Sequence, residues 1–273
     1  MTDSADAGTA HGFAQSWNRI GFVYTRDQFL EFVAPLTADD FMGHAVLELG
    51  FGNGSLLFHV AHCLPSKLVA IDLGDTIERT RRNLADVPVQ PELHRGDLTT
   101  ADLGLFDVVY CVGVIHHLQK PEEGFAAVLR HTRSGGRFHC WVYGREGNAL
   151  IRMVVDPVRR IASRLPWWIT KYAIAVPLVT PYFLLAKLLR AFRLDGPGSP
   201  VRWLPLFEYT RWIAREPFAF FRHVAFDQLV ARCTRYIDRN TIEEWLKDPR
   251  IAPASTYVIC RNGNSWKFGG RKA

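Results

Sequence analysis

The chain has 273 residues, of which 48% are hydrophobic and 22% are charged, and its formal net charge is +6. This composition is that of an ordinary globular protein and excludes a chain too polar to bury a core. The charge is uneven: residues 1–144 carry 11 basic against 17 acidic side chains, whereas residues 145–239 carry 16 against 7. The basic character therefore belongs mainly to one segment.

Residues 1–36 are predicted to form an N-terminal helical segment over the ligand site, with the helical pattern clearest from Arg26 and a disordered start over residues 1–10. Residues 1–12 contain no apolar stretch of the kind found in a secretory signal, so we expect a cytoplasmic protein. The five cysteines are scattered. We expect them to be buried thiols without disulfides, and we expect no metal site.

Residues 45–61 predict a strand, a tight turn and the start of a helix. The turn contains Gly50, Gly52 and Gly54. Glycines allow positive φ and leave the backbone open to a ligand, and the free N–H groups at a helix start favour polar or anionic groups. A phosphate-binding P-loop would need a lysine after the last glycine, and a dinucleotide fingerprint would need glycine where Ser55 stands.

Further strands and helices alternate after this turn. Strands are predicted at 67–73, 89–94, 106–114 and 137–143, and helices at 75–86 and 121–132. Asp72 ends the second strand, 22 residues beyond Gly50, where a carboxylate can accept ribose hydroxyls. Asp97 follows the third strand, and His116 and His117 follow the fourth. The alternation predicts a doubly wound, mostly parallel sheet with its ligand at the carboxyl ends of the strands.

The pattern Glu48-x-Gly-x-Gly-x-Gly resembles the first motif of class I S-adenosylmethionine (SAM) dependent methyltransferases, and residues 106–118 (FDVVYCVGVIHHL) are similar to a motif of a subgroup that includes quinone-methylating enzymes. The resemblance implies a seven-stranded Rossmann-like sheet over residues 37–144 and SAM as the cofactor. In such a fold the glycine loop wraps the methionine part, Asp72 holds the ribose and Asp97 contacts the adenine amine. The implied cofactor site consists of Glu48, Gly50, Gly52, Gly54, Asp72, Leu73, Asp97, Leu98 and Val112.

Residues 145–237 are an insertion relative to a minimal fold of this type, and we interpret them as a helical, basic and aromatic lid. The uncharged run from Tyr172 to Ala186 has 15 residues, and we expect Pro177 and Pro181 to break it. Spanning a bilayer takes about 20 apolar residues, so we expect a lid helix, with a helix on a membrane surface as the alternative. The lid is expected to shape the acceptor pocket with aromatic side chains, namely Trp167, Trp168, Tyr182, Phe183, Trp203, Phe207, Tyr209 and Trp212. The alternative is that these rings pack inward.

Residues 238–273 are predicted to complete the core. Asp238 is placed to cap a last helix, and Asn262-Gly263 predicts the turn of a terminal antiparallel hairpin.

His116 and His117 are the predicted catalytic residues, because a histidine near the methyl group would be a suitable base for a hydroxyl or enol acceptor. The alternative is that one caps the next helix and the other packs against it. Tyr143 and Arg145, at the end of the fifth strand, are weaker candidates for orienting the acceptor.

Three functions stay open at this point. The favoured one is methyl transfer to a small, apolar metabolite of secondary metabolism that can carry an anionic group, with O- or C-methylation preferred over N-methylation. The basic segment motivates an RNA methyltransferase as an alternative, although no RNA-binding module is recognised. A nonenzymatic SAM-binding or membrane-peripheral protein is the third. The sequence predicts no oligomeric state.

Overall fold

The computed structural model of this chain describes residues 4–19 and 24–273, and its centre is a seven-stranded sheet in the order β3-β2-β1-β4-β5-β7-β6. The strands are β1 (Ala45–Leu49), β2 (Lys67–Asp72), β3 (Glu92–Arg95), β4 (Phe106–Val112), β5 (Thr132–Tyr143), β6 (Tyr257–Arg261) and β7 (Ser265–Arg271). β1 to β5 pair in parallel, and β7 pairs antiparallel with both β5 and β6. The predicted fold, a mostly parallel doubly wound sheet with a terminal hairpin, is confirmed.

Helices cover both faces of this sheet, because its buried strands are apolar on both sides. Val46 of β1 packs in the cluster that includes α2 and α4, whereas its neighbour Leu47 packs in the cluster that includes α6 and α11. The helices of the core are α2 (Arg26–Val33), α3 (Ala38–Phe41), α4 (Ser55–Ala61), α5 (Ile77–Asn83), α6 (Pro121–His131) and α11 (Arg239–Trp245), with short 3-10 turns at η1 (Ile115–His117) and η3 (Pro253–Ser255). Asp238 caps α11 as expected, accepting a hydrogen bond from the Thr241 N–H at 2.8 Å.

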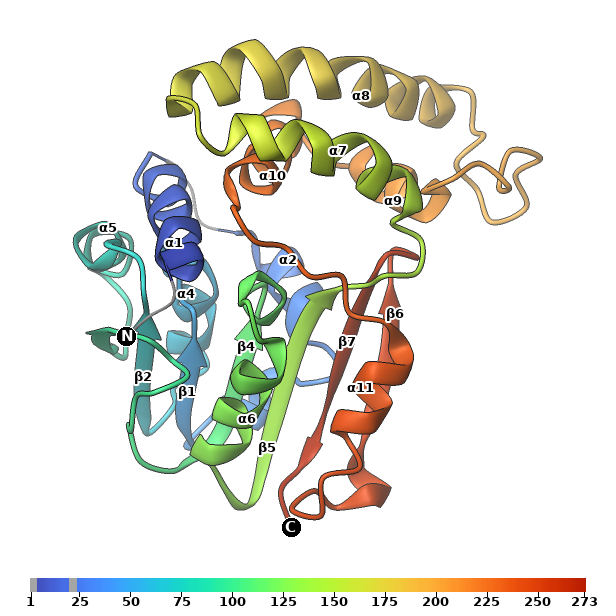
Figure 1. The fold of residues 1–273 in the computed structure, drawn as a ribbon. Coiled ribbons are helices and arrows are strands. Elements are labelled where there is room, and N and C mark those ends of the chain that lie inside the picture. Colours follow the sequence, from blue (N-terminus) through green and yellow to red (C-terminus); the bar gives the residue numbers. More distant parts are fainter. Residues whose placement is uncertain (1–3, 20–23) are drawn as a thin grey trace.

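The insertion forms a helical layer beyond the carboxyl ends of the parallel strands (Figure 1). Its helices are α7 (Ala149–Ala162), a π-helical turn η2 (Ile169–Ala175), α8 (Val176–Ala191), α9 (Phe207–Ile213) and α10 (Phe218–Val230). We call residues 145–237 the lid. α10 packs against α7, η2, α8 and the N-terminal helix, so it lies at the centre of the lid.

The lid leaves and rejoins the core at one place. Gly144 and Ile237 form an isolated parallel bridge at the end of β5, where the Ile237 N–H donates to the Tyr143 carbonyl at 3.0 Å. Asn148 reinforces this junction, because its side-chain amide donates to the carbonyls of Gly144 and Asn264 at 2.7 and 2.6 Å. The start of the lid is therefore fastened to the turn between β6 and β7.

The expectation of a disordered start is wrong for residues 4–10, which belong to helix α1 (Ser4–Trp17). This helix packs against α10. Its small residues allow close approach: a Cβ at Gly12 would lie 2.8 Å from the Val230 carbonyl oxygen. Residues 1–3 of the expected start, and residues 20–23 of the N-terminal segment, lie outside the described residues.

Three further expectations need correction. Pro177 and Pro181 do not end the apolar run, because η2 and α8 form one helix from Ile169 to Ala191 of 23 residues, a length sufficient to cross a bilayer. The third strand begins at Glu92 rather than Val89. Cys260 is exposed, and only two of the cysteines, Cys111 and Cys140, are fully buried.

Gly147 offers a test of the junction between lid and core. Gly147 and Gly104 have similar left-handed φ angles of +73° and +87°, but a Cβ would lie 1.8 Å from the Gly263 carbonyl oxygen at Gly147 and in open space at Gly104. We expect Gly104→Ala to lower the free energy of unfolding by about 1 kcal/mol through backbone strain. Gly147→Ala should cost about 2 kcal/mol more, since it also forces the hairpin turn away. Urea unfolding of both variants measures this difference, and equal losses would contradict the described junction.

Candidate active site

The glycine positions in the turn between β1 and α4 have no room for a side chain. Gly50 has φ +89°, and a Cβ there would lie 2.2 Å from Cγ2 of Val114. Gly52 has φ +55°, and its missing Cβ would lie 3.2 Å from the ring of Trp17 in α1. The glycine backbone is thus enclosed between the loop after β4 on one side and an indole ring on the other.

Asp72, at the end of β2, holds this turn in place. Its Oδ2 accepts a hydrogen bond from the Gly52 N–H at 2.8 Å, and its Oδ1 accepts one from the Gly74 N–H at 2.6 Å. An ionised carboxylate offers about four acceptor positions, so further donors can still bind. Burial raises the pKa of Asp72 to about 6, and the two backbone hydrogen bonds oppose this shift.

Glu48, at the end of β1, is a second buried carboxylate beside the same turn. It is 1% exposed, and its Oε2 accepts a hydrogen bond from the Tyr110 hydroxyl at 2.9 Å. Burial raises the pKa of Glu48 to about 8, and the nearby Asp72 adds to the shift. A cation entering the site would favour the ionised form of this carboxyl group.

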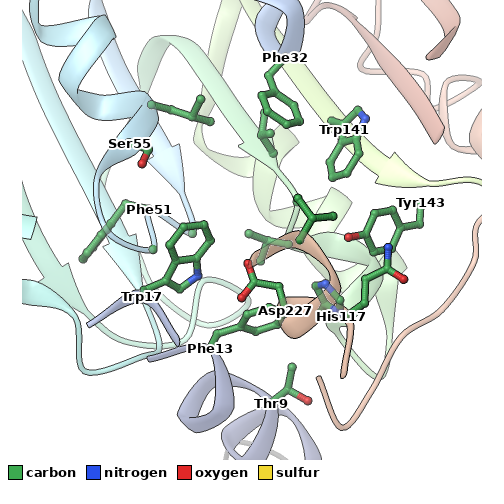
Figure 2. Close-up of a pocket in the computed structure, with 18 of the residues that line it drawn as sticks. Thr9, Phe13, Trp17, Phe32, Phe51, Ser55, His117, Trp141, Tyr143 and Asp227 are labelled. Atoms are coloured by element: carbon green, nitrogen blue, oxygen red, sulfur yellow. The ribbon is translucent and has the colours of Figure 1, made fainter. Parts of the chain in front are cut away.

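These groups line one cavity of about 230 Å³ that continues from the glycine turn to a wall of aromatic rings beneath the lid. Figure 2 shows Phe13 and Trp17 on one side of it, Trp141 and Tyr143 on the other, and Asp227 between them. The rest of the aromatic wall consists of Tyr24, Phe32, Tyr209, Trp212, Phe220 and Tyr236. The cavity therefore has a polar end on the core and an apolar end under the lid.

The structure brings together most of the residues that the sequence assigned to the cofactor. Those that line the cavity are Glu48, Gly50, Gly52, Asp72, Leu73, Asp97, Leu98 and Val112. Gly54 does not line it. Its Cβ would lie 2.7 Å from Cγ2 of Thr80, so this glycine permits packing between the turn and α5.

Trp17 and Tyr24 both line the cavity, yet both also pack in aromatic clusters. The Trp17 ring lies 4.9 Å from that of His223, and the Tyr24 ring is stacked on Phe32 at 5.5 Å. Both rings therefore face the cavity and fill the interior at the same time.

The two candidate histidines have different surroundings. His116 is fully buried and is not among the residues that line the cavity, and its Nδ1 lies 3.4 Å from the Tyr143 N–H nitrogen, from which it accepts. His117 does line the cavity, and its Nδ1 lies 2.9 Å from the Cys233 carbonyl oxygen. A carbonyl only accepts, so Nδ1 carries the proton in the neutral ring and Nε2 is the basic nitrogen. Burial lowers the pKa of His117 to about 4, which keeps the ring neutral. Only His117 stays a candidate base.

The acceptor-orienting candidates also separate. Tyr143 lines the cavity, whereas Arg145 is directed to Asp238, 3.9 Å away, and lies outside it. Of the eight lid aromatics expected in the acceptor pocket, Tyr209 and Trp212 line the cavity. Trp168 and Trp203 are exposed instead, at 55% and 75%.

Among the charged residues of the cavity that had no signal in the sequence are one residue of α10 and one of β6. Asp227 in α10 accepts a hydrogen bond from the Ser16 hydroxyl at 2.6 Å and lies 2.9 Å from Nε2 of His223. Arg261, at the end of β6, is 7% exposed and lies among the rings of Phe32 and Trp212, with its guanidinium carbon 4.5 and 4.9 Å from their centroids. Each reaches the site through tertiary folding from a segment without a motif.

Comparisons with known proteins address the core most directly. Residues 46–136 match the family model described as a methyltransferase domain. An uncharacterised protein of Synechococcus is 33% identical over 119 residues, covering 41% of this chain and 28% of that protein. A tRNA U34 carboxymethyltransferase of Helicobacter acinonychis is 29% identical over 97 residues, covering 33% of this chain and 37% of that enzyme. The matches thus span well under half of these relatives.

Structural similarity extends over the whole chain. The crystal structure of a magnesium protoporphyrin IX methyltransferase from Synechocystis, with bound S-adenosylhomocysteine (SAH), covers 98% of both chains at a TM-score of 0.56 and 15% identity. At that identity the likeness concerns the fold. Together with the family model and the glycine turn, it identifies the α/β core of this chain as a class I SAM-dependent methyltransferase domain.

Proposed function

We propose that the protein transfers a methyl group from SAM to a small, largely apolar acceptor held under the lid. The observation that supports this proposal most directly is the single cavity that joins the glycine turn and Asp72 to the aromatic wall. A cofactor and an acceptor bound at its two ends would lie next to each other without intervening protein.

The polar end of the cavity fits SAM. The glycines remove the side chains that would fill it, Asp72 keeps acceptor positions for the ribose hydroxyls, and Asp97, which also lines the cavity, is assigned to the adenine amine. Asp72, with a pKa of about 6, gives this end a negative charge at neutral pH, and a bound cationic cofactor would also favour the ionised form of Glu48. When bound, SAM supplies an electrophilic methyl group on its sulfonium.

The apolar end of the cavity fits a flat or hydrophobic acceptor, such as a prenylated, polyketide or lipid-like molecule. Aromatic walls give large apolar contact area with few rotatable bonds. Methyl transfer needs the nucleophile in line with the methyl carbon, and fixed orientation of this kind contributes about 7 to 11 kcal/mol to lowering a barrier. The role of the rings is thus to hold the acceptor and to exclude water.

Arg261 supports an anionic group on the acceptor. Its Nη2 lies 3.0 Å from Oε1 of Glu31, but its Nε has no hydrogen-bond acceptor among the residues that the structure describes. A buried guanidinium with an unused donor favours a ligand oxygen, and a carboxylate or phosphate suits it best. The other charged residues of the cavity described here are carboxylates, so Arg261 would set the orientation of an acidic acceptor.

Proton removal from a hydroxyl or enol acceptor is assigned to His117. Its neutral ring keeps Nε2 available as a base, and its ring lies 5.9 Å from that of Tyr143 at the apolar end. This assignment favours O- or C-methylation, in which a proton leaves the acceptor. Asp227 also lines the cavity, and its carboxylate would stabilise the positive charge that His117 acquires when it takes the proton.

RNA methylation is kept as a second candidate because a tRNA U34 carboxymethyltransferase is among the relatives. That match spans 33% of this chain and 37% of that enzyme, so most of the chain lies outside it. Retention of the protein on RNA at low salt, with loss at higher salt, would favour this candidate. A SAM-binding protein without transferase activity would bind SAH and transfer no methyl group to any fraction of a cell extract.

Asp72→Asn should weaken SAH binding by about 10- to 100-fold, because one hydrogen bond to a charged group contributes about 1.5 to 3 kcal/mol. Asp75→Asn, in an exposed residue 3.6 Å from Arg95, is the matched control and should bind normally. Since burial raises the pKa of Asp72 to about 6, protons compete with the ligand below that pH, and the affinity of the unaltered protein should fall by up to about tenfold per pH unit. Calorimetry between pH 5 and about pH 8 tests both points. The step near pH 6 should vanish in Asp72→Asn, and its persistence there would overturn the ribose assignment.

His117→Ala should leave SAH affinity unchanged and slow methyl transfer by about 10²- to 10⁴-fold. The measurement uses radiolabelled SAM and fractionated metabolites of the host. His62→Ala, in an exposed histidine of the same core, serves as the control. Normal turnover in His117→Ala would remove this residue from the chemistry.

Arg261→Met should discriminate between acceptors by charge. Methionine keeps the contact with the rings of Phe32 and Trp212 but offers no donor, so transfer to acidic fractions of the metabolite extract should fall about tenfold or more while transfer to neutral fractions is retained. Thermal unfolding of the variant checks that the fold tolerates the loss of the ion pair with the partly exposed Glu31. Equal losses in acidic and neutral fractions would exclude Arg261 from acceptor recognition.

A further inference from the structure

The long lid helix is apolar on both sides. Within Ile169–Ala191, the most apolar 18-residue stretch has a mean hydropathy of 1.6, yet only 17% of that stretch is buried. A helix of this composition is normally enclosed on all sides. In Figure 1, α8 is the outermost element of the lid, so one of its sides has no covering layer from the described chain.

The inner side of this helix is packed. Ala175 is buried in a cluster with Phe226 of α10, and Val179 and Ala186 are buried in a cluster with Ile213 and Phe221. Its outer side carries Tyr172, Leu184, Leu188 and Phe192 at exposures of 52%, 55%, 54% and 72%. Every exposed residue between Tyr172 and Leu188 is apolar or aromatic.

The helix contains three cations, of which Lys171 lies over aromatic rings and the other two bind backbone carbonyls. Lys187 donates through Nζ to the carbonyls of Ala214 and Glu216 at 2.9 and 3.0 Å, and Arg190 donates to the Ala214 carbonyl at 3.0 Å. Both side chains thus bind the backbone that follows α9. The helix does contain charged residues, but Lys187 and Arg190 bind backbone carbonyls instead of adding free charges to the outer side.

The apolar surface continues along the chain and has a basic border. Ile161, Leu165 and Trp168 precede the helix with exposures of 66%, 37% and 55%, and Trp203 follows it at 75%. Exposed arginines stand beside them at positions 152, 160, 164, 193 and 202. Residues 149–203 contain nine Lys or Arg residues and only two acidic residues, Asp156 and Asp195. We call the exposed residues of 150–203 the outer lid face.

We propose that the outer lid face binds the surface of an anionic lipid bilayer, with the Ile169–Ala191 helix lying in the plane of the headgroups. Leucines and phenylalanine would enter the boundary of the acyl chains, Trp168, Tyr172 and Trp203 would lie at headgroup depth, and the arginines would meet lipid phosphates. Charge complementarity favours this occupant over a neutral surface. Exposed apolar side chains gathered in this number in one segment mark a docking site rather than ordinary protein surface.

The internal contacts of the lid favour lying on the bilayer over crossing it. Crossing would pull Lys187 and Arg190 from their carbonyl partners and separate Val179 and Ala186 from the lid core. Binding at the surface keeps these contacts. It also brings the cavity close to the bilayer, because Ile151 of α7 and Phe220 of α10 line it from the lid side.

Vesicle flotation tests the proposal with the full chain. The probe is vesicles of phosphatidylcholine and phosphatidylglycerol in a roughly two-to-one ratio, against phosphatidylcholine alone. We expect the protein to float with the anionic vesicles and Leu188→Gln/Phe192→Gln to lose at least about tenfold in partitioning. Met42→Gln/Leu105→Gln is the matched control, since these two residues of the α/β core lie on its surface with similar exposures of 53% and 64%. It should float like the unaltered chain.

The remaining outcomes decide against the proposal. Failure to float with anionic vesicles, or equal flotation of both double variants, would overturn it. Retention on the vesicles after alkaline carbonate would indicate a spanning helix, and a dimer that Leu188→Gln/Phe192→Gln converts to monomers without any flotation would assign the face to a second copy. SAH binding of each variant is measured in parallel. It reports on the proposed enzymatic function separately, because none of these residues lines the cavity.

Discussion

The two hydrogen bonds accepted by Asp72 are the constraint on which the site depends. They join the end of β2 to the backbone of Gly52 and Gly74, so the second strand determines the shape of a turn that belongs to the first. The turn is then closed by Val114 after β4 and by Trp17 from α1. Three neighbouring strands and the N-terminal helix therefore meet at one loop. The partly buried carboxylate of Asp72 fixes the position of that loop through its two hydrogen bonds.

The core could be predicted because its signals are local. Glycines at fixed spacing, an acid at a strand end and continuous apolar runs each report on a few neighbouring residues, and parallel topology brings the ends of such strands together. The third strand is predicted from Val89, but β3 begins three residues later, at Glu92. Its short, half-buried course gives it a weaker pattern than β4, which is buried along most of its length.

The parts that sequence missed depend on contacts between distant segments. Helix α1 is rich in small residues that look like a disordered start, but Gly12 and Ala14 are small because α10 and the core lie against them. Pro177 was expected to interrupt the apolar run, whereas it falls at the start of α8 directly after a π-helical turn, where a missing N–H costs little. Asp227 and Arg261 enter the cavity from α10 and β6, and no spacing rule connects those segments.

The lid begins and ends at the bridge between Gly144 and Ile237, so nearly a hundred residues depart from and return to a single point beyond β5. A segment tethered in this way is interchangeable in principle: its length and composition alter the chamber above the sheet while the pairing of every strand below stays the same. Substitutions and insertions in this segment can therefore change the acceptor that such a protein takes, and the surface at which it works, without altering the residues that hold the methyl donor.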